Sequence, residues 1–288
     1  MFQPATSSAH AAGSAGRQPR SRRGIRLDDE LREQYYPEQR FGGFTDADGA
    51  ITFYMRVCEL LPPSGVALDI GCGRGTQGED PVRTRRGLRI LRGRCRSVIG
   101  IDIDPAAADN PFLDEFKLIS AAGSSWPVES ASVDLCLADF VIEHIEDPDA
   151  FVAECARVLR PGGSLCIRTV NANSYLGLAS RLFPARLHAR LLGRIQPERD
   201  AQDVFRTHYR CNTRRRLAAN LVRHGFDAAV YGHEAEPGYL GFSPLAYRLG
   251  VMHARHAPSA LRVGLLAFGR LDATSERGLK RAGCGELC

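Results

Sequence analysis

The sequence lacks the long apolar runs from which membrane-spanning helices are built. No stretch of its 288 residues approaches the roughly 18 consecutive apolar residues that such a helix requires. Lysine is also scarce and occurs only at positions 117 and 280, so arginine carries almost all of the positive charge behind the formal net charge of +5. An arginine bias of this kind accompanies GC-rich coding sequences. Net charge alone is therefore weak evidence for a nucleic-acid partner.

Paired cysteines are absent as well. The nine cysteines include no CxxC pair and none with histidine partners at metal-ligand spacing. Their odd number and scattered positions argue against a disulfide framework and against a zinc site. We therefore expect a reducing, cytoplasmic location and no bound metal.

The N-terminal residues 1–27 are small, polar and basic. They lack the continuous apolar core of a secretory signal, and we expect a disordered tail. A transit peptide is the alternative, because serine and arginine are present and acidic residues are absent. The missing amphipathic apolar face disfavours it.

Apolar residues at helical spacing alternate with short apolar runs that have the composition of buried strands. We expect helices over residues 46–61, 147–160 and 213–225, and strands over 66–70, 97–104, 116–120, 133–139, 164–170 and 226–232. Strands that alternate with helices predict an α/β fold with a doubly wound, mostly parallel sheet and helices on both of its faces. Ligands bind such a sheet at the carboxyl ends of its strands.

Individual residues mark the ends and faces of two of these helices. Asp147 is expected to cap the second helix, and the run 161–163 (Pro-Gly-Gly) is expected to end it. In the third helix, Leu217, Leu221 and Val222 are expected to face the core.

A glycine-rich turn, LDIGCGRG, follows the first expected strand. Gly71, Gly73 and Gly75 let the backbone approach a ligand closely and adopt dihedrals that other residues resist. Thr76 stands where a dinucleotide-binding fingerprint would place its third glycine, which disfavours a dehydrogenase.

Two carboxylates flank this turn in the expected sheet. Asp69 directly precedes it, and Asp102 ends the next strand, where a carboxylate can accept hydrogen bonds from both ribose hydroxyls. The ligand is therefore expected to be a nucleoside.

Four motifs in order, LDIGCGRG, VIGIDIDP, SVDLCLADFVIEHIEDP and ECARVLRPGG, resemble the class I S-adenosylmethionine-dependent methyltransferases, in particular the methyltransferase type 11 group. The resemblance covers about 100 residues and is weak beyond about residue 170. It implies a seven-stranded, Rossmann-like sheet, S-adenosyl-L-methionine as the cofactor, and methyl transfer as the reaction.

The resemblance also implies particular cofactor contacts. The methionine end of the cofactor would lie against the loop, with Asp69 near its amino group, Asp102 on the ribose, Ile103 on the adenine and Asp139 near the reacting methyl. The expected cofactor-binding residues are Asp69, Gly71, Cys72, Gly73, Gly75, Asp102, Ile103 and Asp139.

The sequence departs from the family in two places. Ala121 and Ala122 stand where an acid usually meets the adenine amino group, which would leave its recognition to backbone groups, Ser124 or Ser125. The spacing from Gly71 to Asp102 is 31 positions, about ten more than the roughly 20 of compact nucleotide folds.

The inserted region is rich in arginine, at positions 83, 85, 86, 89, 92, 94 and 96. These side chains could hold phosphate or carboxylate groups of a substrate, or RNA. The interpretation that we favour has Leu88, Ile90 and Leu91 packing inward while the arginines stay solvated. No aromatic residue interleaves the arginines, so a nucleic-acid partner is not expected.

Methyl transfer to a hydroxyl needs a base, and His144, which follows the fourth strand, is the candidate catalytic residue. A purely structural role for His144 in a helical turn is the alternative. Polar residues in the expected substrate lid, residues 171–212, are candidates for acceptor contacts. They are Asn171, Asn173, Tyr175, His208, Tyr209 and Arg210.

We divide the rest of the chain into a helical cap, a methyltransferase domain and a C-terminal extension. Their expected limits are residues 28–62, 63–235 and 236–288. The extension is expected to complete the sheet and cover the acceptor, and peripheral membrane contact is its alternative.

The expected function is methylation, through oxygen, of a small or lipid- or sugar-linked acceptor. A non-catalytic binding or scaffold protein of the same fold is the main alternative, and RNA methylation is a minor one. The oligomeric state stays open.

Overall fold

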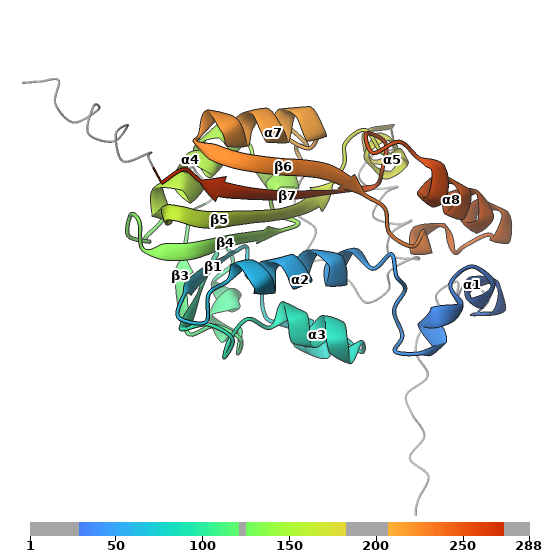
Figure 1. Ribbon diagram of the computed structural model, residues 1–288, viewed down its shortest axis with the longest axis horizontal. Helices are drawn as coiled ribbons and strands as arrows, with labels where there is room; N and C mark the ends of the chain where they lie inside the picture. The colour runs from blue at the N-terminus through green and yellow to red at the C-terminus, as the bar shows by residue number, and fades with distance from the viewer. Residues whose placement is uncertain (1–28, 121–124, 183–206, 274–288) are drawn as a thin grey trace, which may run out of the picture.

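A seven-stranded sheet forms the centre of the protein in the computed structural model, which describes residues 29–120, 125–182 and 207–273 (Figure 1). The strand order is β3-β2-β1-β4-β5-β7-β6. The strands are β1 (Val66–Ile70), β2 (Ser97–Asp102), β3 (Glu115–Leu118), β4 (Val133–Asp139), β5 (Leu159–Val170), β6 (Phe226–His233) and β7 (Gly264–Leu271).

Strands β1 to β5 pair in parallel, and β7 runs antiparallel to both of its neighbours, β5 and β6. The expected fold class, a mostly parallel seven-stranded sheet, is confirmed. A domain boundary at residue 235 would separate β6 from β7, which lies between β5 and β6. We therefore place both strands in the same domain.

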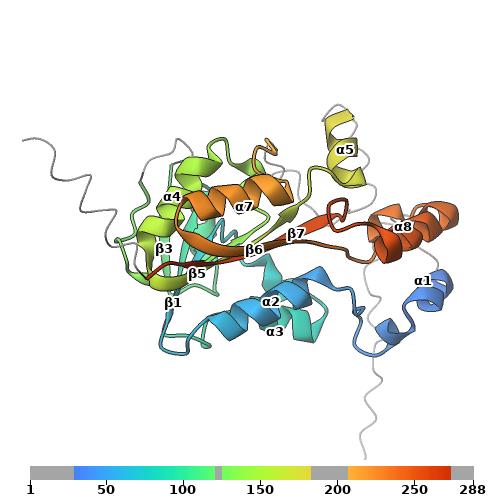
Figure 2. The same ribbon diagram turned by 45° about the horizontal axis from the view of Figure 1, so that its top comes forward.

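Helices cover both faces of the sheet (Figure 2). The helices are α1 (Asp29–Tyr35), α2 (Gly49–Leu60), α3 (Arg83–Arg89), α4 (Pro148–Val158), α5 (Tyr175–Leu182), α7 (Arg214–Arg223) and α8 (Pro244–His256). Short 3-10 turns are η1 (Pro37–Arg40), η2 (Thr76–Glu79), η3 (Pro105–Asp109), η4 (Ile142–His144) and η6 (Gly238–Leu240). Helices α2 and α3 lie on one face, and α4 and α7 lie on the other.

Each face of the sheet has its own apolar core. Phe53 and Val57 of α2 are fully buried in the first core. Val152 of α4 and Leu217 of α7 are fully buried in the second core. Side chains of successive strand residues point to opposite faces, so largely apolar strands can supply both cores.

Side-chain caps fix where three of the helices begin. Asp48 accepts hydrogen bonds from the second and third residues of α2, and Asp147 does the same for α4. Thr213 accepts one from the backbone of Arg216 in α7. Each cap satisfies amide groups that have no partner within the helix.

Two expectations about these helices are wrong. Helix α4 ends at Val158, and the run 161–163 lies inside β5, where the pairing with β4 jumps from Leu159 to Ser164. The strand accommodates the proline and glycines as an irregularity in this pairing, since that is where a sheet tolerates such residues. Val222 of α7 is 62% exposed, whereas Leu217 and Leu221 are fully buried.

Helices α1, α5 and α8 lie beyond the end of the sheet where the parallel strands finish (Figures 1 and 2). Tyr247 and Val251 of α8 pack with Leu31 of α1 and with Tyr36 in a small separate cluster. None of the helices in the part of the chain that the structure describes is long and apolar enough to cross a membrane.

Neighbouring residues of α7 allow a direct test of this packing. Leu221→Ala should lower the free energy of unfolding by about 2–5 kcal/mol, because it opens a cavity in the core. Val222→Ala should change it by less than about 0.5 kcal/mol. Urea denaturation of both variants measures the difference, and equal effects would contradict the assigned helix face.

Candidate functional site

The glycine turn after β1 contains three residues with positive φ. The φ angles are +66° at Gly71, +56° at Gly73 and +86° at Gly75. A Cβ atom would come within 2.7 Å of Val141 at Gly71 and within 2.9 Å of Asn110 at Gly75, but would meet nothing within 4 Å at Gly73. Packing therefore explains two of the glycines, whereas the backbone at Gly73 borders open space that a ligand can enter.

The carboxylate of Asp102 lies directly against this turn. It accepts a hydrogen bond from the Gly73 amide through Oδ2 and one from the Asp104 amide through Oδ1, each 2.9 Å long. The side-chain amide of Asn110 donates to the carbonyl oxygens of Cys72 and Gly73 at 3.1 and 3.0 Å. The loop is thus held in place, and each Asp102 oxygen keeps a lone pair for a further donor.

Asp69, at the end of β1, makes no hydrogen bond or ion pair within the described residues. Its burial, together with the negative charge of Asp139, raises the pKa of its carboxyl to about 7. An added cation would relieve both effects, because it restores the interactions that the carboxylate loses on burial. The site therefore suits a ligand that carries an ammonium group.

Cys72 and Ile103 flank these carboxylates. Burial raises the pKa of the Cys72 thiol, so the side chain stays a neutral apolar group. The side chain of Ile103 is 42% exposed directly after β2. It offers an apolar surface next to Asp102.

A buried ion pair joins β4 to β5 at the same edge of the sheet. Arg168 donates two hydrogen bonds to Asp139, from Nε to Oδ1 at 2.6 Å and from Nη2 to Oδ2 at 2.7 Å. The Tyr54 hydroxyl of α2 donates to the same carboxylate at 3.0 Å. The guanidinium also lies over the rings of Phe53, Tyr54 and Phe140, 4.8–5.8 Å from their centroids.

The charges in this group stabilise one another. Burial alone would lower the pKa of Arg168, but the Asp139 carboxylate outweighs it and raises the pKa above its ordinary value. Burial and the nearby Asp139 raise the pKa of Tyr54 far above its usual range, so its hydroxyl remains a hydrogen-bond donor. Sequence reasoning missed the roles of Arg168 and Tyr54. The one signal for Arg168 was an arginine inside an otherwise apolar strand.

Residues 68–167, which contain the glycine turn, Asp102 and Asp139, match the family described as "Methyltransferase domain". A probable S-adenosylmethionine-dependent methyltransferase of Mycobacterium tuberculosis (strain H37Rv) is 33% identical over 120 residues, which are 40% of this chain and 40% of the relative. Residues 68–167 of this chain are therefore similar to S-adenosylmethionine-dependent methyltransferase domains.

A second curated relative and a solved structure are also similar to this chain. An uncharacterized methyltransferase of Mycobacterium sp. (strain KMS) is 32% identical over 146 residues, 49% of this chain and 54% of the relative. The chain thus spans about half the length of the curated relatives that it matches. A methyltransferase structure from Archaeoglobus fulgidus is 15% identical with a TM-score of 0.49, over 81% of this chain and 97% of that one. The fold itself rests on the strand order described above.

Two histidines lie near the glycine turn of the methyltransferase domain. His144 ends η4, which follows Val141, the neighbour of Gly71. The backbone amides of His208 and Tyr209 both donate to the carbonyl of Glu143 in that turn, at 2.7 and 3.2 Å. The returning segment therefore brings His208 to the turn that carries His144.

The other expected acceptor contacts lie in different environments. Asn171 is 1% exposed, and its side-chain amide donates to the carbonyl oxygens of Ala260 and Arg262. Asn171 therefore ties the end of β5 to residues 260–262, and its side chain is not available to an acceptor. Asn173 is exposed, and Tyr175 is partly buried against the ring of His253.

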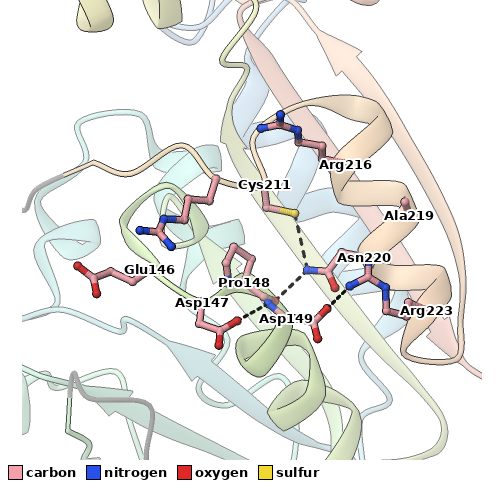
Figure 3. A pocket seen from close by; sticks show the side chains of 10 residues that line it. Glu146, Asp147, Pro148, Asp149, Cys211, Arg216, Ala219, Asn220 and Arg223 are labelled. Carbon is pink, nitrogen blue, oxygen red and sulfur yellow. Dashed lines mark hydrogen bonds and ion pairs between the residues drawn. The ribbon is translucent and has the colours of Figure 1, made fainter.

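Arg210 lines an open cleft of about 530 Å³ between α4 and α7 (Figure 3). Both signs of charge line the cleft. Arg223 of α7 pairs with Asp149 at the start of α4, and Arg216 lies farther along the cleft. Residues 183–206 of the expected lid lie outside the described residues, as do Ala121, Ala122 and Ser124. Ser125 is described, and its hydroxyl contacts Glu154.

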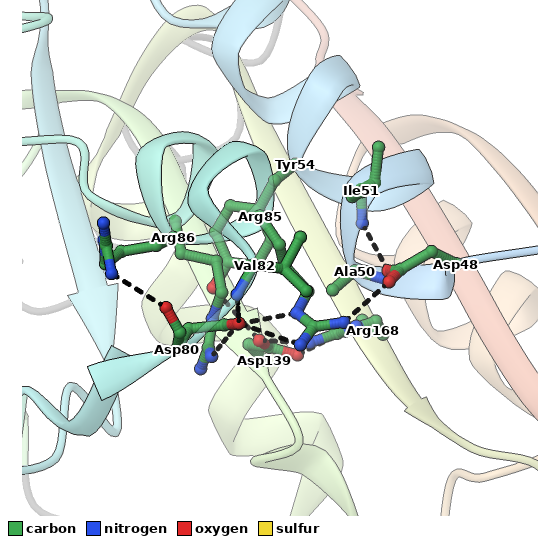
Figure 4. A network of polar contacts seen from close by, with 11 residues as sticks. Asp48, Ala50, Ile51, Tyr54, Asp80, Val82, Arg85, Arg86, Asp139 and Arg168 are labelled. Atoms are coloured by element: carbon green, nitrogen blue, oxygen red, sulfur yellow. Dashed lines mark hydrogen bonds and ion pairs between the residues drawn. The ribbon is translucent and has the colours of Figure 1, made fainter. Parts of the chain in front are cut away.

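The arginine-rich insert is tied into the protein by ion pairs (Figure 4). Arg85 donates to Asp80 at 2.6 and 2.8 Å and to Asp48, the cap of α2, at 2.8 Å. Arg86 donates to the carbonyl of Asp80, and Arg89 lies 3.7 Å from its carboxylate. The interpretation that all these arginines stay solvated is therefore wrong for Arg85, Arg86 and Arg89. Carboxylates bind Arg85 and Arg89, and a backbone carbonyl binds Arg86.

The apolar residues of the insert divide in a similar way. Leu91 is buried at 3% exposure, whereas Leu88 and Ile90 are partly buried. Arg92 contacts Asp114, and Arg94 contacts the carbonyl of Gly87. The guanidinium groups that RNA binding would need are thus largely engaged within the protein.

The ion pair between Arg168 and Asp139 can be tested by a double-mutant cycle. Arg168→Gln should destabilise the protein by about 3–5 kcal/mol, because it leaves a buried carboxylate without its counter-ion. Adding Asp139→Asn should recover much of this loss. Arg160→Gln, on the same strand but in a more exposed pair with Asp134, should cost about 1 kcal/mol or less. Additive losses in the double variant would contradict the pairing.

Asp69 should limit the stability of the protein without ligand. Its raised pKa means that the folded state resists ionisation of this carboxyl. The stability that the protein has with a protonated Asp69 is therefore full at low pH and is lost as the pH rises through about 7. Asp69→Asn should therefore raise the free energy of unfolding at pH 8 by about 1–3 kcal/mol and change it little near pH 4. Denaturation at both pH values measures this, and a variant that is less stable at pH 8 would refute it.

Proposed function

We infer that the protein transfers a methyl group from S-adenosylmethionine to a hydroxyl group of a small or lipid- or sugar-linked acceptor. Three features at one sheet edge carry this proposal: Asp69, which has no partner among the described residues, the open backbone at Gly73, and the Asp102 carboxylate. Asp69 offers a partner for an ammonium group, Gly73 leaves room for the methionine portion of the cofactor, and Asp102 offers a partner for a ribose.

The residues present fit the cofactor group by group. Asp69 would hold the ammonium of its methionine portion, since the carboxylate has no other partner within the described residues. Asp102 would accept hydrogen bonds from the ribose hydroxyls, and the exposed Ile103 would pack on the adenine. When bound, S-adenosylmethionine supplies a methyl group that is already activated on a sulfonium.

The protein must then position an acceptor and remove its proton. Proximity and orientation supply most of the acceleration when the methyl is activated, and a base is needed because a hydroxyl is a poor nucleophile. His144 is the proposed base, on the turn beside the glycine loop. Asp139 is held twice by Arg168 and is therefore proposed to shape the methyl-transfer region and not to take the proton.

Oxygen as the acceptor atom has support from one relative. A ubiquinone biosynthesis O-methyltransferase of Cupriavidus pinatubonensis is 32% identical over 113 residues, 37% of this chain and 41% of that protein. The exposed Asn173 and Arg210, with His208 and Tyr209, are the proposed acceptor contacts. Asn173 follows the carboxyl end of β5, and the segment that contains the other three returns to the turn that carries His144.

Calorimetric titration with S-adenosylmethionine and S-adenosylhomocysteine tests the cofactor site. We expect micromolar binding that weakens at least about tenfold in Asp102→Ala, because the ribose loses a charged hydrogen-bond acceptor. Asp109→Ala, an exposed carboxylate on the turn after β2, should bind like the wild type.

A folded wild-type protein that binds neither compound would refute the methyltransferase proposal. The fold would then serve the non-catalytic binding role that the alanines at positions 121 and 122 suggest.

A further inference from the structure

A stripe of exposed apolar side chains runs along η6 and α8, two elements that contain none of the residues proposed to bind the cofactor. Of the thirteen large apolar side chains that are exposed among the described residues, five lie within residues 239–252. These are Tyr239 (36% exposed), Phe242 (49%), Leu245 (68%), Leu249 (57%) and Met252 (60%). The concentration separates this segment from the single exposed apolar residues that any protein surface carries.

The stripe is not the core-facing side of α8. Tyr247 and Val251 form that side and are buried against α1. At about 100° of rotation per residue, Leu245, Leu249 and Met252 fall within about 60° of one another, on the opposite side of the helix. Helix α8 therefore has one apolar face that packs on the protein and a second that nothing in the described chain covers.

The charges along α8 have a single sign. Its sequence, PLAYRLGVMHARH, contains no acidic residue. Arg248 and Arg255 are exposed and, at about 100° per residue, lie on the same flank of the stripe. Arg255 also lies over the ring of Tyr35, 5.6 Å from its centroid, which leaves Arg248 as the basic group beside the apolar side chains.

We propose that the stripe and Arg248 dock onto the surface of an anionic phospholipid bilayer, with α8 lying in the plane of the headgroups. Apolar side chains on one side of a short helix, with cationic side chains at their edge, are the features of such interfacial helices. Among the described residues, the side chains of the stripe are exposed, and α8 lies beyond the end of the sheet (Figures 1 and 2).

Charge distinguishes a bilayer from a second copy of the chain as the partner. A two-fold contact between two α8 helices would bring Arg248 and Arg255 of one copy near the same residues of the other, with no acid on either helix to offset them. Anionic headgroups offset these charges directly, by about 1 kcal/mol per basic residue.

Bilayer docking would also position the site. The ring of Tyr175, the first residue of α5, contacts the ring of His253 in α8 with 5.3 Å between centroids. Helix α5 follows β5, which carries Arg168 at the carboxyl edge of the sheet. The membrane surface would thus lie on the side of the protein where α5 follows the carboxyl end of β5. The docking proposal does not depend on the methyl-transfer activity.

Co-sedimentation of the full chain with vesicles tests the proposal. We expect pelleting with phosphatidylcholine vesicles that contain phosphatidylglycerol and little pelleting with phosphatidylcholine alone. Leu249→Glu should reduce the apparent affinity for the anionic vesicles at least about tenfold, since it places a carboxylate in the apolar stripe. Arg248→Ser should reduce it about fivefold.

Val222→Glu, at an isolated and equally exposed apolar position on α7, is the matched control and should pellet like the wild type. Circular dichroism and thermal unfolding establish that each variant is folded. All variants keep the basic residues of the N-terminal segment 1–28, so a contribution from that segment is common to every sample.

Two results would overturn the proposal: a wild-type protein that stays in solution with anionic vesicles, or a Leu249→Glu variant that pellets as well as the wild type. Sedimentation velocity identifies the competing partner. A wild-type dimer that Leu249→Glu converts to a monomer, together with no vesicle binding, would assign the stripe to a second copy of the chain.

Discussion

The carboxyl edge of the parallel strands depends on a cation buried between two strands and a helix. Arg168 and Asp139 are direct partners in the register of β5 and β4, and Tyr54 and Phe53 bring α2 onto the same group. A buried guanidinium without a carboxylate would be very unfavourable, so the two strand ends and the helix must come together as a unit. Asp69 borders this unit without an ion-pair partner among the described residues, and the charge of Asp139 adds to the cost of ionising it.

The parts of the fold that were predicted from the sequence are those with local signals. Asp147 was expected to cap α4 and does so, because a short polar side chain precedes apolar periodicity there and the capping contact involves residues only two or three positions away. The parallel strands were recognisable as short apolar runs. The prediction for the run 161–163 was wrong because its proline and glycines indicate the end of a helix, whereas in the structure they lie inside β5, where its pairing with β4 is irregular.

The polar contacts across the fold could not be predicted in the same way. Arg168 and Asp139 are 29 positions apart, and their pairing follows from strand register, which no local pattern encodes. Arg85 shows the same limit, because the composition of the insert does not reveal that Asp48, 37 positions earlier, binds its guanidinium. The glycine turn could be located from sequence, but only the packing separates Gly73 from Gly71 and Gly75.

The place of β7 in the sheet has a consequence for how the protein forms in the cell. β5 has β4 on one side and β7 on the other, and β7 ends at Leu271. During synthesis, β5 therefore keeps one unpaired edge until the residues of β7 have left the ribosome. Unpaired edges of this kind are sites of mispairing and aggregation in nascent chains. The second edge of β5, the strand that carries Arg168, is therefore covered late in synthesis. The pairing that covers it joins residues about a hundred positions apart, and contacts of such long sequence separation form slowly.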